Sequence, residues 1–359
     1  MCFFMKRVGI VILIALVFTS CKIFQVQPLQ VEDLVIYPPP PDTVRIQYLT
    51  SINNSIDVKG RRSPFIDFII GKETPMGVIS PLEISSTGSD LIICDNMIRG
   101  AELINFEEKT FEYFIPKGRG KLIQPVSCEL DSLGNLFFVD KKRKQIVVFN
   151  KTDKGFKYKT AFGEKEDYEP YDILAFKNRL YVPNTKSRKI DVYDGTNFNF
   201  LFSFPNEKTK GDGKFIMPKY IEGYGNNIYV PDFIANTIKV FDLDGNFIRS
   251  VGSIGTFPGQ FARIKDIAID KDENLYAVDA AFGIVQIFNR KGQLLMFFGG
   301  QNGNSGDMIL PRAIYISYSH NKYFEQYVDP AFKLKYVIFV SNQQSQNKVN
   351  VYGFVEEKN

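Results

Sequence analysis

Across most of the chain, short stretches of alternating apolar and polar residues are separated by polar turns, and one pattern returns six times. In each copy an apolar run ends in Asp or Asn, a polar turn follows, and an alternating segment ends at an aromatic residue. The fifth copy, LYAVDAAFGIVQIFN, shows it most clearly. Alternation with a period of two residues predicts β-strands, and no segment between the copies has the pattern of a long helix. The chain is therefore expected to be all-β.

The spacing of the copies predicts the number of sheets. The residues that end the apolar runs are Asp95, Asp140, Asn184, Asp232, Asp279 and Asn342, and neighbouring members are 45, 44, 48, 47 and 63 residues apart. A unit of about 40 to 50 residues with four strands is one blade of a propeller. Six units predict a six-bladed β-propeller of four-stranded antiparallel blades over residues 45–359. The recurring Asp and Asn side chains are expected to cap turns rather than to bind metal.

The two ends of the repeat region predict how the ring closes. The sixth unit lacks sequence for an outer strand after KVNVYGF, whereas RIQYLTSI at residues 45–52 has the missing pattern. We expect this N-terminal strand to pair with residues 348–354, which leaves no large open edge. The insertion at 316–336 accounts for the longest spacing, and its many aromatic residues favour a surface that faces a partner. The apolar stretch 63–72 is expected to be a short helix or loop packed under the ring.

The first residues have the layout of an export signal. Lys6 and Arg7 precede an apolar run from Val8 to Phe18, and FTSC resembles the lipobox of bacterial lipoproteins. We predict a signal peptide at 1–20, a lipid on Cys21, and a lipidated anchor and stiff proline-rich spacer at 21–44. A plain secretory peptide with an incidental Cys21 is the alternative. The expected location is a bacterial membrane outside the cytoplasm, and Lys22 favours the outer membrane.

Composition excludes several classes of chemistry. A net charge of +4 on 359 residues gives no reason to expect nucleic-acid binding. The one histidine, His320, lies in the insertion, so neither a three-His zinc site nor a Ser-His-Asp triad is expected near the ring axis. No C-x-x-C-H motif is present, and no cofactor is predicted. Cys94 and Cys128 fall in apolar strands. They are expected either to form a disulfide or to remain as two buried free thiols.

Two units carry a family resemblance. The segment DIAIDKDENLYAVD followed by VQIFNRKGQ, and the fourth unit from MPKYIEGYGNNIYVPD onward, are similar to the NHL repeat. With the lipobox and the YPPPPDTVRIQYL entry, the chain resembles bacterial NHL-repeat lipoproteins, which implies a six-bladed propeller. That fold hosts many tasks, so the resemblance implies little about function.

Aligning the blades places candidate ligand-binding residues on the ring axis. The units align at a proline near the start of each inner strand, or at Ile264 in the fifth unit. The residue after this position is Tyr171, Lys219, Lys265 or Arg312 in four blades. The residue after that is Glu83, Asp172 or Asp266 in three blades. The basic residues predict attraction for a small anionic ligand, whereas mutual pairing or solvation of these charges is the alternative. The carboxylates are candidate oxygen ligands for Ca²⁺, although no metal is predicted.

The function expected from these features is binding rather than catalysis. We predict a lipid-anchored cell-envelope protein that presents a rigid propeller to an envelope protein partner or a ligand. The alternative is a calcium-dependent hydrolase of the lactonase type that uses the axial carboxylates. The membrane, through the N-terminal lipid, is the other expected partner, and no catalytic residue is predicted.

Overall fold

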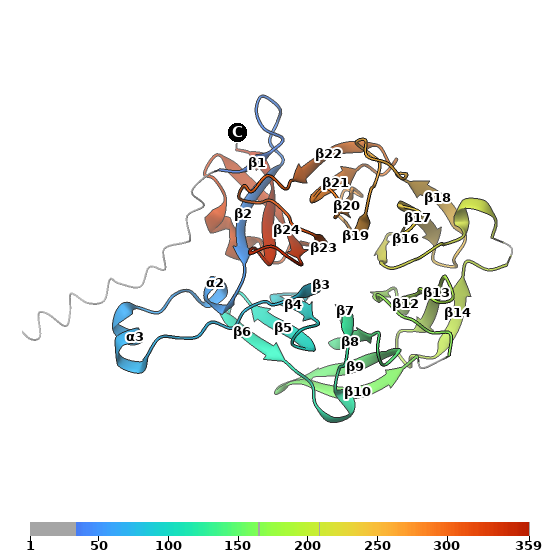
Figure 1. Cartoon of the computed structure of the whole chain (residues 1–359), viewed down its shortest axis with the longest axis horizontal. Coiled ribbons are helices and arrows are strands. Elements are labelled where there is room, and N and C mark those ends of the chain that lie inside the picture. Colours follow the sequence, from blue (N-terminus) through green and yellow to red (C-terminus); the bar gives the residue numbers. More distant parts are fainter. Residues whose placement is uncertain (1–33, 164–165, 208, 359) are drawn as a thin grey trace, which may run out of the picture.

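The computed structural model describes residues 34–163, 166–207 and 209–358, and it is a ring of six antiparallel sheets (Figure 1). The fold class is therefore the one predicted: an all-β, six-bladed propeller. The predicted signal peptide at 1–20, the lipidation site Cys21 and the first part of the predicted spacer lie outside the described residues. Within the described part, no helix is long and apolar enough to cross a membrane.

Five blades contain four consecutive strands each, with the first strand innermost. Blade one comprises β3 (Pro81–Thr87), β4 (Asp90–Asp95), β5 (Gly100–Asn105) and β6 (Thr110–Phe114). Blade two comprises β7 (Pro125–Leu130), β8 (Asn135–Asp140), β9 (Gln145–Thr152) and β10 (Gly155–Phe162). Blade three comprises β11 (Leu174–Phe176), β12 (Arg179–Asn184), β13 (Lys189–Asp194) and β14 (Phe200–Phe204). Blade four comprises β15 (Glu222–Tyr224), β16 (Asn227–Asp232), β17 (Thr237–Asp242) and β18 (Phe247–Val251). Blade five comprises β19 (Ile264–Ile269), β20 (Leu275–Asp279), β21 (Ile284–Phe288) and β22 (Leu294–Gly299).

Blade six is built from both ends of the described chain. Its strands are, from the axis outward, β23 (Pro311–Ser317), β24 (Phe332–Asn342), β25 (Val349–Glu357), β2 (Ile46–Ile52) and β1 (Ile36–Tyr37). The antiparallel pairing of β2 with β25 brings Ile46 opposite Phe354 and Ile52 opposite Val349. The predicted closure by residues 45–52 is confirmed. Because N-terminal and C-terminal strands share one sheet, neither end of the ring presents a long unpaired edge.

The turn after each second strand is held by the recurring acidic residue. Asp140 accepts hydrogen bonds from the backbone N–H of Ile123 at 2.6 Å, of Gln124 at 3.2 Å and of Arg143 at 3.0 Å. Asp95, Asp232 and Asp279 accept equivalent bonds. A buried carboxylate that collects several backbone donors ties the turn to the segment that enters the inner strand. The predicted capping role is confirmed.

The hydrophobic core lies between neighbouring blades. One cluster, for example, packs Phe137 and Val148 of blade two against Leu180 and Tyr193 of blade three. Alternate residues of every strand face one neighbour or the other, so both faces of a blade are apolar. Cys94 and Cys128 lie in such a cluster between blades one and two, and both thiols are free and buried.

The segment before β2 differs from the predicted stiff spacer over residues 34–44. Pro38–Pro41 form the turn between β1 and β2, and the hairpin is closed by hydrogen bonds from Arg45 N to Tyr37 O and from Tyr48 N to Val35 O. Val35 and Tyr37 also pack against the core of blade six. Burial of these apolar side chains outweighs the extended preference of the prolines, so this part of the chain folds onto the ring.

The long insertion at 316–336 is a packing element. It extends β24 and contains α4 (Asn321–Phe324) and the 3₁₀ turn η4 (Glu325–Tyr327); the other 3₁₀ turns are η2 (Gly118–Gly120) and η3 (Gly211–Gly213). Phe324 is fully buried against Phe106 and Phe339. His320 is buried beside them, and its Nδ1 lies 2.6 Å from Ser317 Oγ. Burial lowers the pKa of His320. These aromatic residues fill the seam between blades six and one.

Two short helices connect β2 with β3. In α2 (Ser55–Lys59), Val58 is buried and Asn54 caps the first turn. In α3 (Pro64–Ile70) none of the residues is buried, and the helix projects beyond the rim of the ring on a loop (Figure 1). The expected helix at 63–72 is therefore present, but it is not packed under the ring.

Candidate functional site

Irregular starts of the inner strands aim polar side chains at the ring axis. In β19 the register with β20 shifts between Ile264 and Ile267, and in β23 the register with β24 shifts between Pro311 and Ile314. Blades one and two have similar shifts just after Pro81 and Pro125. A bulge interrupts the strict alternation of side chains and re-aims the extra residue. Consecutive residues such as Lys265 and Asp266 therefore both contribute to the axial region.

Three of the candidate residues meet at the axis. Glu83, Asp172 and Asp266, called here the axial cluster, come from blades one, three and five, are all buried, and place one carboxylate oxygen each within 4.8 Å of the others. Asp172 accepts from Ser127 Oγ at 2.5 Å and from Ile221 N at 3.0 Å, and Asp266 accepts from Ile314 N at 2.9 Å. The two aspartates thus also join each blade to the next.

Burial and mutual repulsion shift these groups toward the protonated form. Desolvation is the largest cause for each of the three, and it raises the pKa of Asp172 to about 6. The pKa of Glu83 lies well above its usual range because of burial and then the charges of Asp266 and Asp172, and Asp266 behaves similarly. Such shifts are expected when acidic groups share one dry site. The three carboxyl groups are therefore stabilised either by taking up protons or by a positive charge placed beside them.

Arg312 lies beside this cluster. It is buried, and it donates from Nε to the carbonyl oxygen of Leu82 at 3.1 Å and from Nη2 to that of Val126 at 3.2 Å. Its positive charge lowers the pKa of Glu83 and Asp172, against the larger effect of burial. Arg312 therefore joins blade six to blades one and two, and it offsets part of the charge of the axial cluster.

The other predicted basic residues gather around two aromatic rings. Lys219 Nζ lies 3.7 Å from the centroid of the Phe233 ring, and Lys265 Nζ lies 5.0 Å from the same centroid. Lys219 is also 5.0 Å from the centroid of Tyr171. These four side chains, called here the cation–aromatic group, are half-buried. Among the described residues, neither lysine belongs to an ion pair.

The charges in the cation–aromatic group perturb one another. Burial, followed by the charges of Arg312 and Lys219, lowers the pKa of Lys265 to about 8. Burial also lowers the pKa of Lys219. For Tyr171 burial acts to raise the pKa, but the positive charges of Arg312 and Lys219 outweigh it, and the net shift is downward. A negative charge placed near Lys219, Lys265 and Arg312 would be stabilised by the positive charge of all three.

Some residues of this region were not predicted. Phe233 and Lys141 immediately follow the turn residues Asp232 and Asp140, and their backbone N–H groups bond to Met217 O and Gln124 O, next to the start of an inner strand. That pairing brings their side chains to the face that carries Lys219. Lys141 lies 5.9 Å from the Tyr171 centroid and pairs with Glu169 at 2.8 Å. Aligning the position after each turn acid would have identified both residues.

A second layer of acids was also missed. Glu129 and Glu222 stand two residues beyond Ser127 and Tyr220 on the inner strands, and the Glu129 carboxylate accepts from Ser85 Oγ at 3.1 Å. Glu129 and Glu222 are half-buried, and most of the volume around each carboxyl group is filled by protein. The resulting desolvation raises the pKa of both residues to about 8. Because side chains two residues apart on a strand share a face, the positions of Ser127 and Tyr220 could have predicted these two acids.

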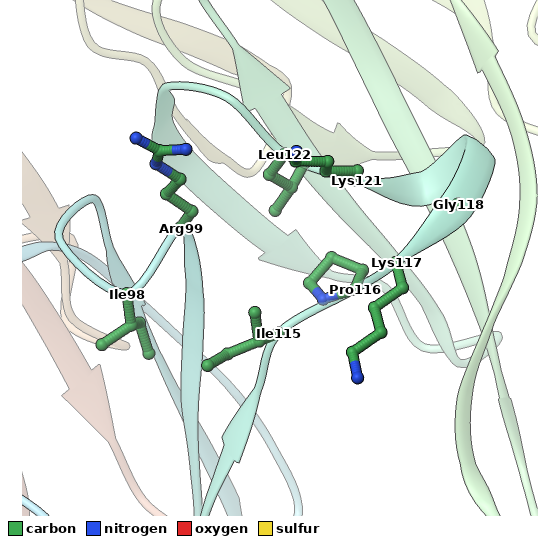
Figure 2. A pocket seen from close by; sticks show the side chains of 8 residues that line it. All are labelled: Ile98, Arg99, Ile115, Pro116, Lys117, Gly118, Lys121 and Leu122. Atoms are coloured by element: carbon green, nitrogen blue, oxygen red, sulfur yellow. The ribbon is translucent and has the colours of Figure 1, made fainter.

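A surface cleft lies apart from the axis, between blades one and two (Figure 2). It has a volume of about 350 Å³, and its apolar lining includes Ile115, Pro116 and Leu122, while Arg99 and Lys117 stand at its border. No acidic residue lines it. The axial region is the stronger candidate site, because charged and aromatic groups from several blades converge there.

Comparison with known proteins supports the architecture. The family model DUF5128, described as a 6-bladed beta-propeller, matches residues 202–294. No curated protein matches the sequence. A solved protein of unknown function from Bacteroides thetaiotaomicron superposes with a TM-score of 0.59 at 12% identity, covering 87% of this chain and 76% of that one. A streptogramin B lyase superposes with a TM-score of 0.51 at 14% identity, covering 76% and 82%. A protein from Lactobacillus plantarum gives 0.51 at 14% identity, covering 80% and 91%.

These similarities concern the fold. Identities of 12% to 14% over most of both chains show that the polypeptides share a propeller architecture. Function depends on the side chains placed on that architecture, so it has to be argued from the site itself.

Proposed function

We propose that this protein is a binding propeller of the bacterial cell envelope that receives an anionic group of a partner or small ligand at its cation–aromatic group. Lipid attachment at Cys21 and placement at the outer membrane belong to the same proposal, as does descent from NHL-type repeats. These three points rest on the FTSC motif, Lys22 and the repeat pattern.

The observation that carries the proposal is the pair of lysines over one ring. The Nζ atoms of Lys219 and Lys265 lie 3.7 and 5.0 Å from the centroid of the Phe233 ring, and both lysines are half-buried. Holding two ammonium groups close together and away from water costs free energy. A cation–π contact offsets part of that cost, and an anion bound between the lysines would offset more. Sites that hold unpaired charges against each other are typical of binding surfaces.

Rigidity supports binding rather than chemistry. Tyr220 packs edge-on against Tyr171 with ring centroids 5.5 Å apart, and Arg312 is fixed by two carbonyl oxygens. Tyr171 and the neighbouring cation Arg312 are thus held in place from several blades before any ligand arrives. Preorganised groups of this kind bind without a large ordering cost.

Calorimetric titration of the full chain tests the proposal, with inorganic phosphate and a short oligoglutamate peptide as probes. We expect at least one probe to bind, and the double variant K219M/K265M to bind it at least tenfold more weakly. Lys291→Met, a substitution at an exposed turn lysine of blade five, serves as the matched control and should leave the affinity unchanged. Binding of neither probe, or equal binding by the double variant, would contradict the proposal.

A second candidate function is favoured by the geometry of the axial cluster. Three carboxylates whose oxygens lie within 4.8 Å could hold a hard cation such as Ca²⁺ and support a calcium-dependent hydrolase. Ca²⁺ takes six to eight oxygen ligands, so waters or substrate would have to complete the shell. Elemental analysis of protein purified without chelators tests this. One equivalent of calcium that is lost in Asp266→Asn favours this function, whereas calcium-free protein argues against it.

A further inference from the structure

The loop that carries α3 exposes an unusual amount of apolar surface. The exposed fractions are 71% for Phe65, 87% for Phe68, 61% for Ile69 and 65% for Ile70. These four side chains, called here the α3 tip, lie on one seven-residue helix, in which Ile66 and Asp67 separate Phe65 from the apolar run 68–70. Contiguous apolar groups that stand in water mark a surface that is covered in the working state of the protein.

The α3 tip is presented by an ordered base rather than by a loose loop. The Ser63 side chain caps α3, and Pro64 occupies its first turn. At the base of the loop, Arg62 Nε lies 2.9 Å from Glu73 Oε2, and Ser55 exchanges hydrogen bonds with Met76. Figure 1 shows the helix standing clear of the blades. The fold therefore holds the apolar residues out from the rim instead of burying them.

The charges around the α3 tip indicate what covers it. Between residues 59 and 73 the chain has four basic residues, Lys59, Arg61, Arg62 and Lys72, against two acidic ones, Asp67 and Glu73. All four basic side chains are exposed. This arrangement is complementary to an anionic lipid surface. The aromatic and aliphatic side chains can enter the acyl-chain region, and the flanking Arg and Lys side chains can contact the negative headgroups.

The dimensions fit the same partner. A helix of seven residues is about 10 Å long, which is far too short to span a bilayer. It is comparable with the depth of about 5 to 10 Å that interfacial helices reach. If Cys21 is lipidated, the 13 residues from there to Leu34 reach at most about 45 Å, so the rim of the ring would stay near the membrane.

We propose that the α3 tip inserts into the interface of an anionic phospholipid membrane and fixes the orientation of the ring on it. This inference goes beyond the proposed ligand-binding function and does not depend on it. The membrane contact would add a second attachment to the predicted lipid anchor. Two weak attachments together hold a protein far more firmly than either one does.

The chain offers a clean reporter for this contact, because it contains no Trp. Phe68→Trp in the full chain places a single indole at the α3 tip. Phe257→Trp is the matched control, since Phe257 is a similarly exposed phenylalanine, at 74%, on a loop of another blade. Both proteins are mixed with phosphatidylglycerol–phosphatidylcholine vesicles whose acyl chains carry bromine, which quenches only indoles that enter the membrane.

We expect the emission of Phe68→Trp to shift to the blue and to lose at least half of its intensity, and that of Phe257→Trp to stay within a tenth. Adding R61E/K72E to the Phe68→Trp protein should reduce the quenching at least threefold. Equal quenching of the two reporters, or none at position 68, overturns the proposal. A benzophenone side chain at position 68 that cross-links in cells to a protein and not to lipid would also overturn it.

Discussion

Arg312 of blade six donates a hydrogen bond from Nη2 to the carbonyl oxygen of Val126 in blade two, 3.2 Å away, beyond the intervening blade one. A second bond reaches Leu82 in blade one, so one buried side chain connects three inner strands. The residue predicted as a ligand-binding cation is thus also a structural link. Its role can be separated from that of Lys219 and Lys265, which contact aromatic rings rather than backbone.

Arg312→Met is expected to destabilise the protein by about 2 to 4 kcal/mol. The substitution keeps most of the side-chain volume but leaves two carbonyl acceptors without their donor and removes a positive charge next to the axial cluster. Urea unfolding at pH 7 measures the change. Arg290→Met, at an exposed position of blade five, is the control and should change the unfolding free energy by less than about 0.5 kcal/mol. Equal stability of the two variants would show that the links are unimportant.

Leu49→Ala is expected to cost about 2 to 5 kcal/mol, because Leu49 is fully buried in β2, the strand that closes the ring. Leu133→Ala, at a turn residue that is 74% exposed, should have little effect. Urea unfolding of both variants, followed by circular dichroism, tests the expectation. A small loss for Leu49→Ala would mean that closure contributes little to stability.

Glu102→Gln should make stability less dependent on pH. Glu102 is fully buried in β5, close to the carboxylate of Asp95. Burial, followed by the charge of Asp95, raises its pKa well above the usual range. The folded protein therefore holds a proton that the unfolded chain releases above pH of about 4.3. As a result this residue lowers stability as pH rises, by at most about 1.4 kcal/mol per pH unit.

Unfolding free energies at pH 5, 6, 7 and 8 provide the measurement. The wild-type curve should fall relative to that of Glu102→Gln with increasing pH. Glu112→Gln, on the neighbouring strand β6 with an exposed side chain, should follow the wild-type curve. A Glu102→Gln curve parallel to the wild type would show that Glu102 is ionised in the folded protein.

The sequence was informative wherever the repeat constrained a position. Alignment of the inner strands was sufficient to bring Glu83, Asp172 and Asp266 together, because each occupies the same place in its blade. It could not show that Asp172 and Asp266 also bond to the backbone of the next blade, since that depends on how the blades stack. Phe233 was missed because it follows a turn and does not belong to the inner strands. The exposed position of α3 was not foreseen, because an apolar stretch is ordinarily expected to be buried.

The pKa of Lys265 gives a direct test of the proposed anion site. Burial, together with the charges of Arg312 and Lys219, lowers that pKa to about 8, so the ammonium group loses its proton within an accessible range. A bound anion stabilises the charged form, and affinity is therefore expected to be constant below about pH 7 and to fall as pH rises through 8 and beyond. Titration of the full chain with oligoglutamate, whose carboxylates stay ionised above about pH 6, measures this dependence between about pH 6 and 9.5; if only phosphate binds, wild type and Lys265→Met are compared at each pH, because phosphate itself gains charge in this range.

The variant Lys265→Met distinguishes this lysine from other titrating groups near the axis. It should bind the probe more weakly at pH 7 and lose most of the decline centred near pH 8, whereas Lys291→Met should keep the full decline. Removing the buried charge should also stabilise the folded protein at pH 7, by about 1 kcal/mol after allowance for partial solvent screening. The wild-type protein should gain stability between pH 8 and about 10.4, because the unfolded chain then binds more protons than the folded one. Affinity that declines equally in Lys265→Met would assign the titration to another group and remove Lys265 from the site.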